Sequence, residues 1–178
     1  MAKDLLEKLE ALPKYDKPAE EDLVGLIRYR HTKTLGDLHK AFGGKAKETG
    51  IFEAWMGSLS DEIQHAARAY GEHICTEAII QSMQSAQEGI IKDTADLFML
   101  TVIKDNLAWF LLDGSISHEQ GRKFIQMWAS AVHGFDAHAQ TWIEAFMIPE
   151  GLVHAPIARD WCKYNEHDNF GEVIKSKY

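Results

Sequence analysis

The sequence lacks the features of secreted, disulfide-bonded or membrane-spanning proteins. Its two cysteines, Cys75 and Cys162, are far apart and match neither a metal-binding nor a redox spacing, so no disulfide framework is expected. No apolar run approaches the roughly 18–20 residues that a membrane span requires. The N-terminus turns amphipathic and acidic at once, unlike a signal peptide. We therefore expect an intracellular protein in a reducing compartment.

Concentrated positive charge is also missing. The formal net charge is −8 at pH 7, and no long run of Lys or Arg occurs. Binding by phosphate neutralisation needs a concentrated basic face, so nucleic acid is not expected as a partner. With 178 residues, of which 46% are hydrophobic and 26% charged, the chain is long enough to form one hydrophobic core.

The period-two alternation of half-buried strands is absent, whereas apolar residues recur at three- and four-residue intervals. This spacing predicts helices over residues 5–12, 23–42, 52–77, 90–111 and 117–146. Long helices with short connections predict an all-α fold, namely an antiparallel helical bundle. We expect an N-terminal helix and linker over residues 1–18, the bundle over residues 19–158, and a docked tail with loose last residues over 159–178.

Several residues indicate where the helices begin and end. The acidic residues 20–22 suit the positive N-terminal end of the second helix, and the glycines at 43 and 44 are expected to end it. Gly114 readily adopts the left-handed conformation that closes a helix. Ser117 and Gln120 form a Ser-x-x-Gln capping box, in which each side chain satisfies a backbone amide of the other residue.

No motif for nucleotide binding or nucleophilic catalysis is complete. Residues 41–46 contain a Gly-Lys pair but lack the upstream glycine and the following Ser or Thr of a phosphate-binding loop. Neither Gly-x-Gly-x-x-Gly nor Gly-x-Ser-x-Gly occurs, so dinucleotide binding and hydrolase-type attack have no support.

Metal sites are similarly incomplete. A di-iron bundle needs two Glu-x-x-His motifs, and Glu62 with His65 provides one. The pairs His133/His138 and His65/His73 are five and eight residues apart, spacings that do not converge on one metal. The run of residues 166–168, Glu-His-Asp, is a minority candidate for a functional site, since sequence neighbours do not face one another on a helix. The sequence therefore predicts no metal site.

The tryptophans raise the question of a flavin or acyl pocket. Aromatic residues at helical spacing most often pack in a core, so this interpretation is favoured unless a partner chain opens a groove. Long helices with many large apolar side chains can also present an exposed stripe to another subunit. The tryptophans are Trp55, Trp109, Trp128, Trp142 and Trp161.

A resemblance to a known family rests on ordered anchors. Residues 96–111 form a leucine- and isoleucine-lined stretch followed by Gly-Ser-Ile-Ser at 114–117, and residues 143–149 read Ile-Glu-Ala-Phe-Met-Ile-Pro before Ala-Pro-Ile at 155–157. In this order they resemble the C-terminal helical domain of acyl-CoA oxidases, over about residues 20–158. The family favours glycine where Met147 stands here, and Leu-Arg-Pro before the histidine where this chain has residues 132–136.

The resemblance implies a fold like the C-terminal domain of acyl-CoA dehydrogenases. It also implies that the catalytic site lies in other domains of the family. Members carry the flavin site and the catalytic carboxylate in earlier domains that have no matching positions here. No catalytic, cofactor-binding or metal residue is therefore assigned, and FAD is expected on a partner chain rather than bound by this chain alone. Because the chain begins with Met1 and an extra helix, we expect a separate subunit, non-catalytic alone, that assembles with a larger FAD-bearing acyl-CoA oxidase-like chain in fatty acyl-CoA β-oxidation.

Other roles and locations stay open. A structural or adaptor subunit of a larger complex with no role in lipid oxidation is the main alternative, since fold does not dictate function. A small enzyme or acyl-binding protein with an interhelical pocket is the third, and self-association or other protein subunits remain open. Residues 176–178, Ser-Lys-Tyr, differ from the peroxisomal Ser-Lys-Leu signal only at the last position, which leaves the peroxisome open beside the cytoplasm.

Overall fold

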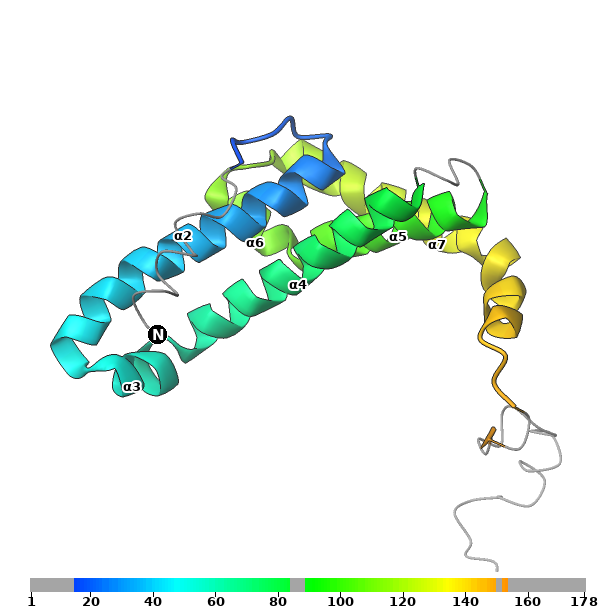
Figure 1. The fold of residues 1–178 in the computed structure, drawn as a ribbon. Coiled ribbons are helices and arrows are strands. Elements are labelled where there is room, and N and C mark those ends of the chain that lie inside the picture. Colours follow the sequence, from blue (N-terminus) through cyan, green and yellow to red (C-terminus); the bar gives the residue numbers. More distant parts are fainter. Residues whose placement is uncertain (1–14, 84–88, 150–151, 154–178) are drawn as a thin grey trace, which may run out of the picture. The chain divides into compact units, whose positions relative to one another are not determined.

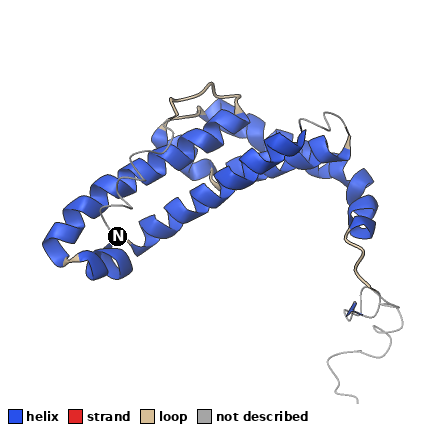
Figure 2. Ribbon diagram, in the orientation of Figure 1, coloured by secondary structure: helices blue, strands red, loops and turns tan. Residues whose placement is uncertain are grey.

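The computed structural model describes residues 15–83, 89–149 and 152–153, and every regular element in these ranges is helical (Figures 1 and 2). The chain divides into two units, residues 1–136 and 137–178. The predicted N-terminal helix and the tail at 159–178 lie outside the described residues. The predicted borders after residues 18 and 158 therefore stay predictions, whereas the all-α fold class is confirmed.

The helices follow one another with short connections. None of those in the described ranges is long and apolar enough to cross a membrane. The elements are α2 (Leu23–Thr49), α3 (Ile51–Glu53), the π-helical turn η1 (Ala54–Ser58), α4 (Ser60–Met83), α5 (Ile90–Asp105), α6 (Leu107–Asp113) and α7 (His118–Ala145).

Helix α2 continues beyond the glycines at 43 and 44, so the expected end there is wrong. A glycine inside a helix costs about 1 kcal/mol relative to alanine, which neighbouring good helix formers can offset. The helix ends instead at Gly50, whose φ of 90° lies in the region that favours glycine. At the other end Asp22 is the N-cap, and its carboxylate accepts a hydrogen bond of 2.8 Å from the amide of Gly25.

The single helix predicted over residues 52–77 is interrupted by η1. The amide of Leu59 donates to the carbonyl of Ala54 at 3.1 Å, a bond that spans five residues instead of four. The wider turn brings Ala54 and Leu59 to the same side, and both are buried. Two apolar residues five positions apart would diverge on a regular α-helix, so the π turn lets both enter the interior.

The helix predicted over residues 90–111 is also broken, at Asn106. Its amide side chain donates to the carbonyl of Val102 at 2.7 Å, so it competes with the backbone bonds of the helix. Asn106 adopts φ −108° and ψ 17°, and α6 starts with the next residue. As expected, Gly114 closes this region in the left-handed conformation, with φ 69°.

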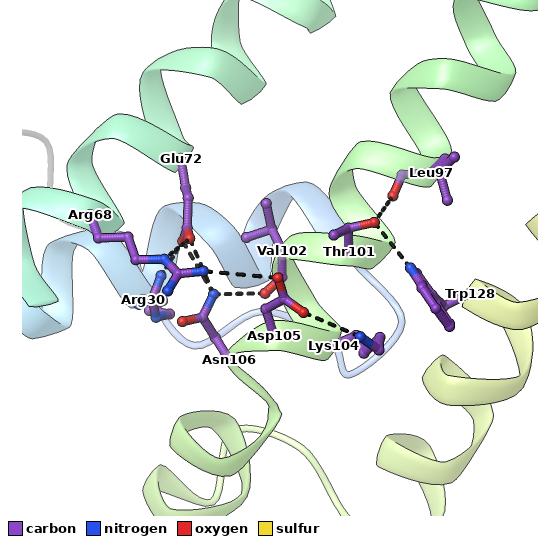
Figure 3. A network of polar contacts seen from close by, with 10 residues as sticks. All are labelled: Arg30, Arg68, Glu72, Leu97, Thr101, Val102, Lys104, Asp105, Asn106 and Trp128. Atoms are coloured by element: carbon purple, nitrogen blue, oxygen red, sulfur yellow. Dashed lines mark hydrogen bonds and ion pairs between the residues drawn. The ribbon is translucent and has the colours of Figure 1, made fainter. Parts of the chain in front are cut away.

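The core of the first unit lies where α2, α5, α6 and the first half of α7 meet. Helix α7 also contacts α5 through Trp128, whose indole N–H donates to the hydroxyl of Thr101 at 3.1 Å (Figure 3). The ammonium of Lys104 lies 4.2 Å from the centre of the same indole ring. The core residues are Leu26, Ile27, Ala95, Met99, Leu100, Val102, Ile103, Phe110, Ile116 and Phe124.

The start of α7 is capped by a residue from far away in the sequence. The hydroxyl of Ser117 accepts from the amide of Gln120 at 3.1 Å, as predicted. The reciprocal partner differs from the prediction, because Glu20 accepts from both the amide and the hydroxyl of Ser117, at 3.1 and 2.8 Å. These hydrogen bonds lower the pKa of Glu20. The segment before α2 is thus attached to the start of α7.

In the second unit, the described residues continue α7 to Ala145. The rings of Trp142 and Phe146 lie 6.4 Å apart, and Gln140 donates to Glu144 at 2.7 Å. Met147 has a φ of 47°, a conformation that glycine adopts without strain. The helix ends near the predicted position.

We expect Ser117→Ala to lower the free energy of unfolding by about 1 kcal/mol, because the first turn of α7 loses its side-chain cap. Urea unfolding followed by circular dichroism measures this. Ser130→Ala is the matched control: Ser130 is exposed in the middle of α7, where alanine is the better helix former, so stability should be unchanged or slightly higher. Equal losses in both variants would contradict the capping role.

Candidate functional site

A half-buried carboxylate, Glu72 on α4, joins three elements of the first unit (Figure 3). It pairs with the guanidinium of Arg30 from α2, and it accepts from Arg68, one turn earlier on α4, at 2.8 Å. Asn106, between α5 and α6, donates to its two oxygens at 3.4 and 3.3 Å. The side chains of Arg30 and Glu72 are only 5% and 13% exposed. Glu72 therefore holds α2, α4 and the α5–α6 junction together.

The environment of Arg30 is unusual for an arginine. Burial lowers its pKa from the ordinary value, and the charge of Glu72 opposes that effect. The guanidinium carbon lies 5.9 Å from the ring centre of Trp109 on α6. Its Nε is buried and has no hydrogen-bonding partner among the described residues. One donor of Arg30 thus stays available.

Next to this network lies a cavity of about 400 Å³. Three helices contribute carboxylates to its lining. These are Asp37 on α2, Glu62 on α4 and Asp105 at the end of α5. Asp37 pairs with Lys33, and Asp105 lies 3.3 Å from the ammonium of Lys104. The lining residues are Arg30, Thr34, Asp37, Leu38, Ala41, Glu62, His65, Asp105, Asn106, Ala108 and Trp109.

A cluster of exposed apolar side chains lies where α2 turns back towards α4. We call it the α3–η1 patch; its members are Ile51, Phe52, Trp55 and Met56, with exposed fractions of 61%, 77%, 45% and 60%. The ring of Trp55 packs edge-on against Phe42 of α2 at 5.8 Å. Phe42 follows Ala41, which lines the cavity. The patch therefore contacts α2, the helix that also supplies part of the cavity lining.

A second buried polar feature is a pair of histidines between α2 and α4. The rings of His31 and His73 are stacked, with centroids 4.7 Å apart and planes at 9°. Neither Nδ1 has a hydrogen-bonding partner among the described residues, although the Nδ1 of His73 lies 3.5 Å from a carboxylate oxygen of Glu77. Burial, and then the positive charge that His73 can carry, lower the pKa of His31 to about 4.

The surroundings of the pair are polar on one side. Glu77 receives two hydrogen bonds from Arg28, at 2.6 and 2.8 Å. Burial also lowers the pKa of His73, against the opposing charge of Glu77. The rings of Tyr15 and His73 meet edge to face with centroids 6.1 Å apart, and the ring centroids of Tyr70 and His31 are 5.5 Å apart. The neutral forms of both imidazoles are therefore favoured.

The structure places two of the residues weighed as metal ligands side by side and separates the third from them. Glu62 and His65 both line the cavity and are exposed, whereas His73 is buried against His31. Among the described residues no group of three or more His, Cys, Asp or Glu could hold a metal ion. Residues 166–168 lie outside the described ranges, so that minority candidate stays a prediction.

The tryptophans divide between core and surface. Trp109 and Trp128 pack against the core, as predicted. Trp55 does not, because it belongs to the α3–η1 patch and is 45% exposed. Trp142 is half-buried beside Phe146, and Trp161 lies outside the described residues.

Sequence reasoning missed the Glu72 network and the histidine pair. Their position in the amphipathic pattern could have indicated them. The inward-facing side of the two helices carries polar residues at Arg30, His31, Glu72 and His73. Polar residues at such positions are usually buried with partners.

Glu72→Gln should lower the free energy of unfolding by about 3–5 kcal/mol, because the buried charge of Arg30 loses its counter-charge. The double variant Arg30→Met/Glu72→Gln should recover a substantial part of this loss, since no isolated charge remains buried. Urea denaturation of the single and double variants completes the thermodynamic cycle. Additive losses would contradict a direct pairing between the two side chains.

Stability should depend on pH through His31. Its folded pKa of about 4 is below the ordinary 6.5, so the unfolded chain binds a proton more readily. The contribution of neutral His31 to the free energy of unfolding is therefore complete above pH 6.5 and is lost as the pH falls towards 4. Between pH 7.5 and 5 we expect a loss of about 2 kcal/mol.

His31→Phe keeps an aromatic ring against His73 but removes one titrating group. In this variant the free energy of unfolding should therefore depend less steeply on pH, as measured by urea titrations at several pH values. Ser130→Ala, which removes no titrating group from an exposed position of α7, serves as control and should leave the slope unchanged. An unchanged slope in His31→Phe would refute the assignment.

A model of one protein family matches most of the chain. The family is described as acyl-CoA oxidase, and the match covers residues 20–160, which include α2 to α7. No curated protein and no solved structure gives a match. The helical fold agrees with the C-terminal helical domain that the sequence anchors resemble. The chain belongs to the acyl-CoA oxidase family.

Proposed function

We propose that this chain is a non-catalytic subunit that assembles with a larger FAD-bearing acyl-CoA oxidase-like chain in fatty acyl-CoA β-oxidation. Family membership supports the link to acyl-CoA oxidation. The observation that carries the proposed assembly is the α3–η1 patch, with four large apolar side chains exposed within six consecutive residues. Single exposed apolar side chains are common, whereas a cluster of this kind is typical of a protein–protein interface.

The patch has the composition of an interface centre. Aromatic residues and methionine are enriched in such centres, and a few of them supply most of the binding energy. Phe52 is the most exposed member, at 77%, and Trp55 is fixed by its edge-on contact with Phe42. A partner that covers the patch would remove these side chains from water.

FAD is placed on the partner chain in this proposal. The resemblance supports this placement, because members of the family carry the flavin site in earlier domains that have no matching positions here. The proposed contribution of this chain is therefore structural completion of the oxidase.

The test mixes the purified chain with a FAD-bearing acyl-CoA oxidase-like chain from the same organism. The two should co-elute in size-exclusion chromatography, and acyl-CoA-dependent production of hydrogen peroxide should rise. Phe52→Glu should weaken the complex at least about 30-fold in Kd, because a charge replaces an apolar contact at the centre of the interface. Calorimetric titration measures the Kd.

Leu112→Glu is the matched control. Leu112 is 89% exposed on α6 and outside the patch, so the same change should leave the Kd within a factor of three. Absence of both co-elution and any change in peroxide production would overturn the proposal. Recovery of subunits unrelated to lipid oxidation in a native pull-down would favour the adaptor role.

A further inference from the structure

We propose that residues 5–12 of this chain dock as an amphipathic helix on an apolar face that α2 and α4 form beside Tyr15. The contact lies within one chain, so this inference does not rest on the proposed function. We call this surface the α2–α4 face; its members are Leu35 and Phe42 on α2 and Ile63, Ala67, Tyr70 and Ile74 on α4.

The α2–α4 face begins at an ion pair and continues as two apolar levels. Helices α2 and α4 lie side by side and antiparallel, and Arg28 pairs with Glu77 (Figure 1). An α-helix drifts by only about 20° over seven residues, so side chains seven positions apart lie on nearly the same side. Two steps of seven residues from the ion pair therefore give the two levels. They are Leu35 with Tyr70, followed by Phe42 with Ile63.

The apolar side chains of this face are incompletely buried. Tyr70 and Ile74 are 50% and 46% exposed, and Ala67 between them in space is exposed as well. The other members are half-buried. Removal of apolar surface from water contributes about 25 cal/mol per Å², so covering this face stabilises the bundle. A face shared by two packed helices is suited to a third amphipathic helix.

Contacts of the described residues before α2 direct the chain onto this face. The amide of Asp22 donates to the carbonyl of Ala19 at 3.1 Å in a turn just before the helix. The ring of Tyr15 then lies beside the first turns of α2, with its centre 5.7 Å from the guanidinium carbon of Arg28. The same ring meets His73 of α4. The chain has thus turned back along α2, and the residues that precede Tyr15 start at the Arg28 end of the face.

Residues 5–12 lie outside the described ranges, but their sequence has the pattern and the length that this face requires. As a helix they would span about 12 Å, and the two residues that link them to Tyr15 add about 7 Å when extended. The rise of α2 from Arg28 to Phe42 is about 21 Å. The segment can therefore reach both apolar levels. The residues that share one side of this helix are Leu5, Leu6, Leu9 and Leu12.

The covalent link favours this segment over a separate polypeptide. Tyr15 is already held against α2 and α4, so the leucines that precede it are present at a high effective concentration, in the millimolar range for short linkers. A second copy or another protein would also lose translational and rotational freedom on binding. The occupant of the α2–α4 face is therefore the chain itself, whereas the α3–η1 patch remains for a partner.

The test measures the protection of a thiol on the face. Ala67→Cys, combined with Cys75→Ser and Cys162→Ser, leaves a single thiol on α4. Its reaction with iodoacetamide, followed by mass spectrometry, should become at least about tenfold faster when Leu9→Glu is added, because a charge in the apolar contact releases the segment.

Ala11→Glu is the matched control, because it introduces the same charge on the opposite side of the expected helix. It should leave the reaction rate within about a factor of two, since the leucine side stays intact. A second control moves the single thiol to exposed Ser130 of α7 by Ser130→Cys. Leu9→Glu should not change the rate there, which shows that it does not act by unfolding the chain.

Two results would rule out residues 5–12 as the occupant. One is an equal reaction rate of the thiol from Ala67→Cys in the Leu9→Glu and Ala11→Glu chains. The other is protection that increases with the concentration of the protein, which would identify a second copy on the face. Protection that is independent of concentration and is lost in the Leu9→Glu chain alone supports the proposal.

Discussion

The pairing of Arg30 with Glu72 is the interaction on which the first unit depends. Arg30 is buried and Glu72 is half-buried at the junction of α2, α4 and the α5–α6 turn, so the two charges must stay together, because Arg30 alone would face a large desolvation cost. A buried pair adds little net stability compared with apolar residues of similar size, but it rejects arrangements in which the two groups separate. Asn106 shares Glu72, so the break between α5 and α6 is positioned by the same group. One carboxylate thus fixes the places of three elements.

The same pairing sets the register of α2 against α4. Arg28 pairs with Glu77, whereas Arg30 and His31, which come later on α2, contact Glu72 and His73, which come earlier on α4. This is the order that antiparallel helices require. Apolar contacts alone tolerate sliding more readily, because many apolar residues are interchangeable in packing. The polar contacts therefore define one register, and with it the alignment of Asp37 and Glu62 on the cavity wall.

The fold class and the approximate position of each described helix could be predicted from the sequence, since apolar periodicity is a local property. The interruptions of the helices could not be predicted in this way. The glycines at 43 and 44 resemble a helix end, yet among these two and Gly50 it is Gly50 that adopts a positive φ and ends α2. The break at Asn106 and the π turn from Ala54 to Leu59 depend on contacts with residues elsewhere in the fold. Glu20, which caps the start of α7, lies 97 residues away from Ser117 in the sequence.

The candidate site was harder to predict for the same reason. In a sequence, Arg30 and Glu72 look like solvated residues on helix faces, because charge is the usual mark of the surface. Their burial follows from the partner that each finds on another helix. The confirmed part of the prediction is the family, because the sequence anchors that indicated it need no tertiary information. A cavity formed by residues from separate helices leaves no contiguous motif.

The same ion pairs determine the character of the neighbouring surface. Asp37 pairs with Lys33, and Asp105 lies close to both Lys104 and Arg68. Because Arg68 also binds Glu72, the carboxylate that fixes the register is linked to the charges at the end of α5. The carboxylates at the cavity are therefore largely compensated by neighbouring cations, whereas the side chains of the α3–η1 patch remain exposed. Charge is satisfied within the bundle, and the apolar patch is the part of this surface that burial against another chain would stabilise.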